Sequence, residues 1–485
     1  MAKQDTVEEV IPSAKRLINS LRSLGYEFPT AVAELIDNSI EADATEVVIK
    51  VEFDGENSWV MIADNGRGMS ADTLKEAMRF GSAKVYNETS LGKFGLGLKT
   101  ASFSQCKHWL VATRSNPLDN EIISYKWYLD HVNRTDRWEI LPIMNNSLDS
   151  VIRDYLQKKT GTVVLWQRLD RIIGYENPDS ERARKRLTTM CRDLEEHLAM
   201  VFHRFLMGEV SRKKLRIFLN DNEILPWDPY ARNEKATKEI DVIRIPLEHD
   251  GVHGEVVIEP YILPPMKAFS SPQAHSKAAG PKKWNQQQGF YIYRNNRMIQ
   301  SGGWCRIRTY EEHIKLARFA INFSSKIDGA FRIDVSKMYV QLPSQIRKDV
   351  EVKTQPMVIR AREIYDNAEK SSSSPPYQDS HSAPVDHERK PVFPGPVPDI
   401  SNIYMHPSLK SDIYVNRSNP ASNFPIGKTM LPYIIKEEKS SSQEKTWSID
   451  EIYHELKKNA KPLEIRILDR LFTRFRKQIQ KKLPD

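Results

Sequence analysis

The first two hundred residues mix helical and strand-like patterns, and the order of these patterns strongly constrains the fold. Residues 45–54 alternate apolar and polar side chains as in a half-buried strand, and residues 59–64 return as a second strand after a turn. Further strands are predicted at 108–114 and 161–169, with helical stretches between and after them. Hairpin-linked strands mixed with helices do not fit a regular βαβ array. The sequence therefore predicts an α/β (α+β) two-layer sandwich.

The helix before this hairpin, within residues 33–44, carries several carboxylates beside an apolar stripe. Glu34 and Asn38 lie four residues apart, so their side chains share one face of the helix. Taken alone, this stretch fits a solvated acidic face equally well. Its role has to be decided from its neighbours.

Composition narrows the class of protein. The chain has 485 residues with 40% hydrophobic content, enough for two or three domains. We expect a cytoplasmic protein without membrane contact, because the N-terminus has no signal-like apolar segment and no apolar run is long enough to span a bilayer. The three cysteines, Cys106, Cys191 and Cys305, are too far apart for a paired zinc motif and do not suggest a disulfide framework. The net charge of +8 permits nucleic-acid binding without proving it.

The second half of the chain shows a different pattern of predicted elements. From residue 215, strand-like segments are separated by turns and by one loop at 265–288, and a helical stretch at 343–369 is expected to be interrupted at Pro356. This predicts a second α+β domain. A Ser- and Pro-rich linker, largely disordered, and a basic amphipathic helical tail are expected to follow it. The predicted parts of the chain are residues 1–206, 207–369, 370–445 and 446–485.

Two glycine-containing segments lie in the first part. In "DNGRGM", Asp64 ends a strand and Gly66 and Gly68 follow it. This carboxylate can accept a hydrogen bond from an exocyclic amine while the backbone approaches a flat base. Taken alone, this segment is more typical of a glycine-rich turn. The second segment, "LGKFGLGLKT" at 91–100, places three glycines before a helix, where backbone N–H groups can approach phosphate.

Two common phosphate-binding motifs do not match the second segment. A P-loop requires lysine directly after its second glycine, but Leu98 follows Gly97. The dinucleotide motif requires a third glycine at the position of Thr100. A different kind of nucleotide site is therefore expected.

Taken in order, four motifs resemble those of the GHKL ATPase superfamily, which includes gyrase B, Hsp90, histidine kinases and MutL. They are ExxxN on a helix, DxGxG after a hairpin, GxxGxG before a helix, and the "GT" of Gly161 and Thr162 that opens a strand. The chain most resembles the MORC branch and its prokaryotic relatives, through "ELIDNSIEADAT", "DNGRGM", "FGSAK" and "GKFGLGLKTASF", across most of residues 10–170. A weaker resemblance, in "GFYIYRNNRMI" and "FRIDVSKMYVQLP", is to the S5-like transducer domain of these ATPases.

The resemblance implies a site for ATP and Mg²⁺. Glu34 would polarise the attacking water and Asn38 would bind Mg²⁺. Asp64 would bind the adenine amine with support from Thr162, and residues 80–97 would form a lid over ATP. The residues implied for nucleotide contact are Asn38, Asp64, Gly66, Gly68, Gly92, Lys93, Gly95, Leu96, Gly97, Lys99 and Thr162.

Transducer domains in this superfamily contribute a lysine to the γ-phosphate, where it neutralises developing charge. Lys337 in "FRIDVSKMYV" matches best and is expected to be catalytic, with Lys326 as the alternative. A plain surface lysine explains either residue equally well at this point.

The implied function is ATP hydrolysis coupled to N-terminal homodimerisation, forming a clamp that acts on DNA without sequence preference, in a restriction, anti-phage or repair setting. An ATP-sensing chaperone-like or scaffolding protein without DNA activity is the alternative. A GHKL protein kinase is disfavoured because no histidine precedes residue 108. The cysteine count excludes a zinc-binding CW module, and the lid sequence is unlike that of MutL. The apolar face of the tail favours a protein partner or packing on the chain itself over DNA.

Overall fold

The computed structural model describes residues 10–370 except for short gaps, together with residues 404–405 and 413–414. The chain divides into two compact units, residues 1–378 and 379–485. The predicted linker and helical tail lie outside the described residues, apart from Lys370 and the short antiparallel pair β15 (Tyr404–Met405) and β16 (Ile413–Tyr414). The gaps fall at residues 24, 82–87, 89, 93–94, 117, 119–120, 158, 175–176, 211–213, 334–336 and 338–339.

The first sheet has eight strands in the order β5-β4-β3-β6-β2-β1-β7-β8. The predicted hairpin at 45–54 and 59–64 is the antiparallel pair β1–β2, in which Val47 lies opposite Asp64. The strands are β1 (Glu46–Glu52), β2 (Trp59–Asp64), β3 (His108–Arg114), β4 (Ile123–Tyr128), β5 (Leu141–Pro142), β6 (Gly161–Gln167), β7 (Arg216–Leu219) and β8 (Asn222–Glu223).

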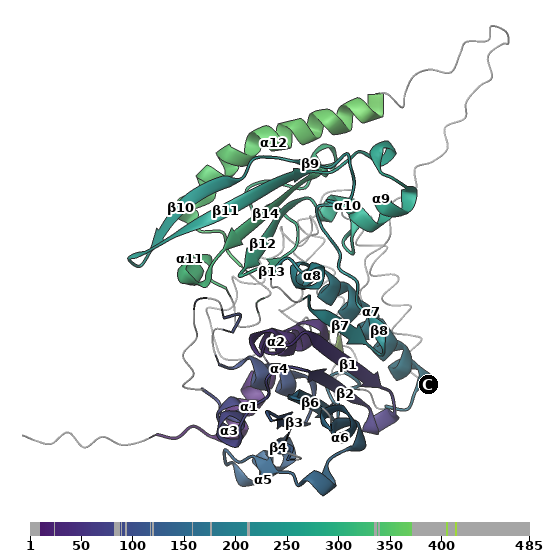
Figure 1. Cartoon of the computed structure of the whole chain (residues 1–485), viewed down its shortest axis with the longest axis vertical. Helices are drawn as coiled ribbons and strands as arrows, with labels where there is room; N and C mark the ends of the chain where they lie inside the picture. Colours follow the sequence, from purple (N-terminus) through teal and green to yellow (C-terminus); the bar gives the residue numbers. More distant parts are fainter. Residues whose placement is uncertain are drawn as a thin grey trace, which may run out of the picture. The chain divides into compact units, whose positions relative to one another are not determined.

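Helices pack on both faces of this sheet (Figure 1). Side chains alternate between the faces along β2: Ile62 joins the core beneath α2, whereas Met61 and Ala63 join the smaller core beneath α6. The same alternation puts the Asp64 side chain on the α2 side. The helices of this region are α1 (Ala14–Arg22), α2 (Phe28–Glu41), α3 (Ala71–Met78), α4 (Gly97–Gln105), α5 (Leu129–Thr135), α6 (Ser150–Leu156), α7 (Glu181–Val201) and α8 (His203–Met207).

The first sheet continues past the expected boundary at residue 206. Strand β7, which the sequence pattern grouped with the second domain, pairs in parallel with β1. Parallel neighbours need a long crossover rather than a tight turn, so no local turn signal marks this pairing.

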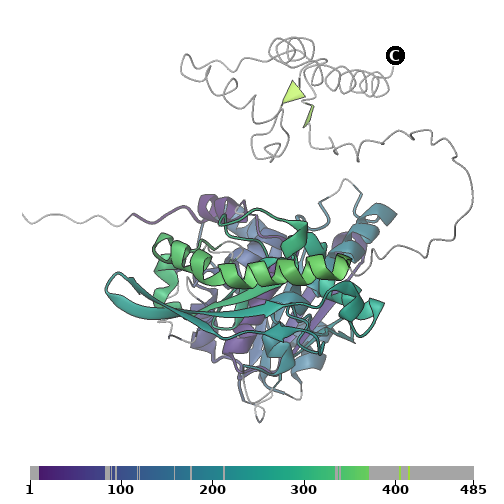
Figure 2. The same ribbon diagram turned by 90° about the horizontal axis from the view of Figure 1, so that it is seen from above.

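The second sheet has the order β10-β11-β14-β12-β13, with β9 paired to β11. The strands β12 and β13 form a hairpin whose turn residues, Asn295 and Asn296, have φ of 46° and 67°, as two-residue hairpin turns require. Figure 2 shows the long helix α12 (Ser344–Lys370) lying along this sheet. The strands are β9 (Lys238–Glu239), β10 (Ile243–His249), β11 (Val252–Ile262), β12 (Gly289–Arg294), β13 (Arg297–Gln300) and β14 (Ala317–Phe323). The shorter helices here are η4 (Glu312–Ile314), η5 (Ser325–Ile327) and α11 (Asp328–Phe331).

The prediction of one loop at 265–288 was wrong. This segment contains η3 (Met266–Ala268), α9 (Pro272–Ala279) and α10 (Lys283–Gln286). The Ser271 hydroxyl accepts a hydrogen bond from the backbone N–H of Ala274, and Pro272 opens α9. Serine before proline is a helix-start signal that the high Pro, Ser and Gly content obscured.

The expected interruption at Pro356 was also wrong, because α12 runs through it. Proline cannot bond to the carbonyl four residues earlier, here that of Val352. Both residues are exposed, so water can satisfy this carbonyl, while Val350, Thr354 and Val358 keep the helix packed on the sheet. No helix in the described ranges is long and apolar enough to cross a membrane.

Candidate active site

Helix α2 presents three polar side chains at the candidate site, two of which, Glu34 and Asn38, the sequence singled out. Glu34 and Asp37 are buried, with 5% and 1% of their surface exposed, whereas Asn38 is exposed. The rest of the helix is mostly apolar and buried, so α2 is an internal helix and not a solvated acidic one. Its carboxylates therefore need partners inside the protein.

Those partners come from the second domain. Lys337 Nζ lies 2.6 Å from Asp37 Oδ2 and 3.2 Å from Glu34. Arg297 on β13 donates through Nε to Asp37 at 2.9 Å, and its Nη2 lies 3.9 Å from Glu34 Oε1. We call these four residues the charge cluster. It contains two carboxylates and two cations, each at most 6% exposed, so the buried charges balance.

The charge cluster also sets the acidity of Glu34. Burial raises the pKa of this carboxyl above its ordinary value, and the nearby Asp37 raises it further, while Lys337 and Arg297 oppose the shift. A carboxyl group with a raised pKa takes up a proton more readily near neutral pH. Such a group, buried beside a lysine, has the properties of a general base or water-orienting residue.

A second carboxylate closes strand β2. Asp64 Oδ2 accepts a hydrogen bond from the Ser39 hydroxyl at 3.1 Å, and Oδ1 accepts one from the Gly66 backbone N–H at 2.9 Å. Thr162 lies opposite Asp64 on β6, and its hydroxyl is 3.3 Å from that of Thr113. Burial raises the pKa of Asp64, and the hydrogen bonds from Gly66, Ser39 and Thr162 oppose this. This carboxylate is held in a fixed orientation and keeps acceptor capacity for an amine.

The glycine-rich segment brings its backbone close to helix α2 at two points, Gly92 and Gly97. Gly97 opens α4, and a Cβ atom there would lie 2.7 Å from Glu34 Oε2, so any other residue would collide with this carboxylate. Leu96 caps α4 without a side-chain hydrogen bond. Gly68 packs its backbone on the end of β3, and the Gly92 N–H donates to Glu41 Oε1 at 2.6 Å. The start of α4 therefore lies beside Glu34, where a helix N-terminus favours phosphate.

Lys99 lies in the first turn of α4. Its ammonium donates to the carbonyl oxygens of Gly95, at 2.6 Å, and Ala77, at 3.1 Å. Burial lowers the pKa of Lys99 to about 8, with Glu76 opposing the shift. The Lys99 side chain therefore links the glycine-rich segment, at Gly95, to the end of α3, at Ala77.

The predicted lid at 80–97 is described only in part, and Lys93 lies outside the described residues. Glu88, Ser90 and Leu91, which we call the lid end, are held by the second sheet. Arg294 donates to the carbonyl oxygens of Ser90 and Leu91 at 2.9 and 3.0 Å, and Asn295 donates to that of Glu88 at 3.0 Å. The β12–β13 turn therefore holds the lid end.

The two candidate lysines of the second domain have different partners. Lys326 forms an exposed ion pair with Glu88, 3.1 Å away at the lid end. Lys337 instead reaches the buried Glu34. The geometry favours Lys337 over Lys326 as the lysine at the phosphates.

The sequence analysis missed Arg294 and Arg297. Both arginines are buried, with 4% and 3% of their surface exposed, and they flank the β12–β13 turn. Two arginines beside an Asn-Asn turn within otherwise apolar strands were the available signal. Buried arginines need anionic or carbonyl partners, and here those partners lie at the candidate nucleotide site.

Comparisons with known proteins identify related sequences over the region that contains Glu34, Asp64 and the glycine-rich segment. Residues 26–162 match the family described as "Histidine kinase-, DNA gyrase B-, and HSP90-like ATPase". The chain is similar to Protein MICRORCHIDIA 5 of Arabidopsis thaliana, 23% identical over 335 residues, which is 56% of this chain and 45% of that protein. It is also similar to ATPase morc-1 of Caenorhabditis elegans, 30% identical over 103 residues, which is 21% of this chain and 12% of that protein.

A bacterial repair protein gives a shorter match. DNA mismatch repair protein MutL of Azorhizobium caulinodans is 41% identical over 70 residues, 14% of this chain and 11% of that protein. The chain thus spans less than half the length of each of these relatives. The family match contains Glu34, Asn38, Asp64, the glycine-rich segment and Thr162. Residues 26–162 form a GHKL-type ATPase domain, and MORC and MutL proteins are distant homologues of this chain.

Proposed function

We propose that this protein is a Mg²⁺-dependent ATPase of the MORC-like type, in which ATP joins two copies into a clamp that acts on DNA. One observation carries the proposal. Lys337, from the second domain, and Glu34, from the ATPase domain, meet in one buried charge cluster although 303 residues separate them in sequence. A nucleotide at Glu34 would therefore be in contact with both domains.

In this proposal Glu34 orients and deprotonates the attacking water. Its raised pKa suits it to take up that proton. The adenine amine would donate to Asp64, and the phosphates would lie along Gly95, Gly97 and the start of α4, near Lys99. Asn38, exposed on α2 one turn after Glu34, would hold Mg²⁺, which neutralises charge on the phosphates when bound.

Lys337 would act as a switch between the domains. It now bonds to Asp37 and Glu34, so a γ-phosphate would compete with these carboxylates for its ammonium. As Lys337 moved away from Glu34, the pKa of Glu34 would rise further, because the lysine is the largest influence that lowers it. Binding of ATP would thus reposition the second domain and prepare the base in one step. We regard the second sheet with α12 as an S5-like transducer domain on this basis.

Dimerisation and DNA contact complete the proposal. Residues 1–28 are the segment available to cross to a second copy, and a lid closed over ATP would add contact area. Of this segment, Val10 and Ile11 are 88% and 70% exposed. The net charge of +8 supports a phosphate-backbone contact without sequence preference. A setting in restriction, anti-phage defence or repair rests on the family resemblance alone.

We expect Asp64→Asn to weaken ATP binding by roughly 10- to 100-fold, the cost of losing a hydrogen bond to a charged acceptor. The asparagine keeps the shape of the side chain, so the loss reports on adenine recognition. The preference for ATP over GTP, measured by calorimetry with both nucleotides, should fall with it. Asp43→Asn is the matched control, because Asp43 is an exposed aspartate paired only at the surface with Arg67. Unchanged ATP affinity in Asp64→Asn would remove the adenine assignment.

ATP affinity should also decrease as the pH rises above about 8. Lys99 is protonated below its pKa of about 8 and neutral above it, so its attraction for phosphate is lost as the pH increases. Titrations with ATP across pH 7 to 9.5 on the wild type would measure this loss. In Lys99→Arg the guanidinium stays charged throughout this range, and the pH dependence should disappear. A wild-type affinity that is constant across this range would contradict a phosphate role for Lys99.

A further inference from the structure

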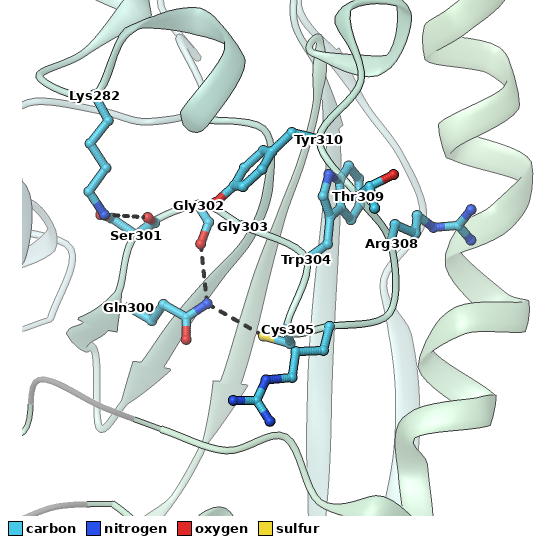
Figure 3. Close-up of a pocket in the computed structure, with 11 residues that line it drawn as sticks. Lys282, Gln300, Ser301, Gly302, Gly303, Trp304, Cys305, Arg308, Thr309 and Tyr310 are labelled. Carbon is cyan, nitrogen blue, oxygen red and sulfur yellow. Dashed lines mark hydrogen bonds between the residues drawn. The ribbon is translucent and has the colours of Figure 1, made fainter. Parts of the chain in front are cut away.

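A cavity of about 540 Å³ lies in the second domain beside the loop that follows β13 (Figure 3). None of the four charge-cluster residues lines it. Its lining combines cationic side chains, glycine backbone and an aromatic ring. The lining residues on which the following argument depends are Lys282, Gly302, Gly303, Arg306, Arg308 and Tyr310.

The loop beside this cavity has an unusual backbone. Gly302 and Gly303 have φ of 68° and 87°, and the non-glycine residues Cys305 and Arg306 have φ of 50° and 63°. A Cβ atom at position 302 would lie 2.7 Å from the Gln286 carbonyl oxygen, so this position also requires glycine for space. The Gly303 N–H donates to the Gln288 carbonyl oxygen at 2.7 Å, so this turn is held against the segment before β12. Strained non-glycine residues are concentrated at functional sites.

The sequence around this loop is strongly basic. Residues 260–310 contain eight lysines and arginines and no aspartate or glutamate. Without these eight, 64 of the 72 basic residues remain, equal to the 64 acidic residues of the chain. The rest of the chain therefore sums to zero net charge. Two of the eight, Arg294 and Arg297, are buried against Asp328 and Asp37, and three of the remaining six, Lys282, Arg306 and Arg308, line the cavity.

Arg308 lacks a full set of partners. Its Nε atom is buried and has no hydrogen-bond partner among the described residues, and its Nη2 makes only a 3.5 Å contact with the Glu351 carbonyl. Figure 3 shows Tyr310, 53% exposed, over the Gly302–Gly303 turn, and Lys282 reaching Ser301. The cations that phosphate can reach directly are the exposed Arg306 and Lys282, which line the cavity together with the exposed ring of Tyr310. Exposed cations beside an aromatic ring suit a phosphate group with an attached sugar or base.

We propose that this cavity and the loop at 301–310 bind phosphate groups of a nucleic-acid backbone. This inference rests on the DNA activity proposed above and gives that activity a contact point. The distribution of charge favours a polyanion over a free nucleotide. A mononucleotide would occupy the cavity but leave Lys267, Lys277 and Lys283, which are exposed nearby in sequence, without a ligand. A chain of phosphates extends beyond the cavity, and its binding would not depend on base sequence.

Fluorescence anisotropy with a short labelled DNA duplex tests the inference on the full chain at several salt concentrations. For Arg306→Ala/Arg308→Ala we expect about tenfold or greater weakening at low salt, and a salt slope smaller by about 2 for the two lost contacts. Arg306→Glu is the second variant, because Arg306 is exposed and its charge reversal should weaken binding without disturbing packing. Lys185→Ala/Arg192→Ala removes two exposed cations from α7 and should bind DNA as the wild type does.

The outcomes distinguish failure of the proposed DNA function from failure of the cavity inference. Wild-type protein that does not bind DNA in any nucleotide state would remove both the DNA part of the proposed function and this inference. Wild-type binding that both cavity variants retain, with an unchanged salt slope, would overturn this inference alone. ATPase rates without DNA should stay at the wild-type level in the cavity variants, because no lining residue belongs to the charge cluster. If the α7 control lost as much DNA affinity as the cavity variants, the inference would also be overturned. DNA binding would then depend on total charge and not on the cavity.

Discussion

Glu34→Ala should reduce the ATP turnover rate by about 10²- to 10⁴-fold, the usual contribution of a positioned general base, while ATP still binds. The contacts expected for adenine and metal do not involve this side chain. They come from Asp64, on β2, and from Asn38, one helical turn further along α2. Nucleotide binding by calorimetry and phosphate release under saturating ATP would measure the two effects separately.

A second substitution distinguishes loss of chemistry from loss of packing. Glu34→Gln keeps the volume of the buried side chain and removes only its charge and basicity, so its turnover should be as low as that of Glu34→Ala. Asn38→Ala should behave differently, because it removes the proposed Mg²⁺ ligand and weakens Mg²⁺-dependent ATP binding as well. Turnover near the wild-type rate in Glu34→Gln would show that the water is activated by another group.

Removal of Glu34 also changes the balance of buried charge. Lys337 and Arg297 would then share Asp37 as their remaining buried carboxylate partner. An unpaired buried charge is costly, and breaking such a pair typically costs about 3–5 kcal/mol. Thermal unfolding of each variant is therefore a necessary companion measurement. A variant that is folded and binds ATP, yet does not turn it over, gives the clearest support for a catalytic Glu34.

The parts of the fold that depend on local patterns could be predicted from the sequence. The β1–β2 hairpin follows from alternation around a turn, and the apolar character of α2 follows from helical periodicity. Glu34 and Asn38 were singled out because they belong to one motif of five residues. In each of these cases the interacting residues are close in sequence, so the pattern itself contains the information.

The remaining features depend on contacts between distant segments. Arg297 lies 260 residues from Asp37, and the parallel pairing of β7 with β1 joins strands more than 160 residues apart. A single sequence does not show which buried arginine faces which carboxylate. Pro356 illustrates a different limit, since the cost of proline in a helix depends on whether the carbonyl it leaves unbonded faces water or the core.

The charge cluster also explains why the second domain should respond to nucleotide. A ligand shifts a conformational equilibrium only by its difference in affinity for the two states. In the present state, Lys337 is held by two carboxylates. Arg294, on β12, holds the lid end through Ser90 and Leu91. ATP would offer Lys337 a phosphate in place of a carboxylate. The lid, through Arg294, and Lys337, through the α2 carboxylates, would then both couple the second domain to the nucleotide.

Lys337→Met should therefore lower ATP turnover by about 10²- to 10³-fold, comparable with losing one preorganised donor to a developing anion. It should also abolish dimerisation by a non-hydrolysable ATP analogue, measured by light scattering. Methionine preserves much of the length and apolar surface of the lysine, so loss of charge is the main change. Lys326→Met is the matched control: this lysine pairs with Glu88 at the surface, and its loss should leave turnover within about twofold of the wild type.

The clamp proposal predicts a second difference between Lys337→Met and Lys326→Met, in their retention on DNA. With the analogue present, wild-type protein and Lys326→Met should remain on closed-circular DNA at a salt concentration that removes them from linear DNA, because a closed ring is retained by topology and not by charge. Lys337→Met should dissociate from both forms of DNA, since its domains no longer respond to the γ-phosphate. If Lys337→Met is folded and still dimerises with the analogue, Lys337 is not the switch. A wild-type protein that stays monomeric under all these conditions would instead favour the ATP-sensor alternative, in which the buried lysine reports nucleotide binding within one chain.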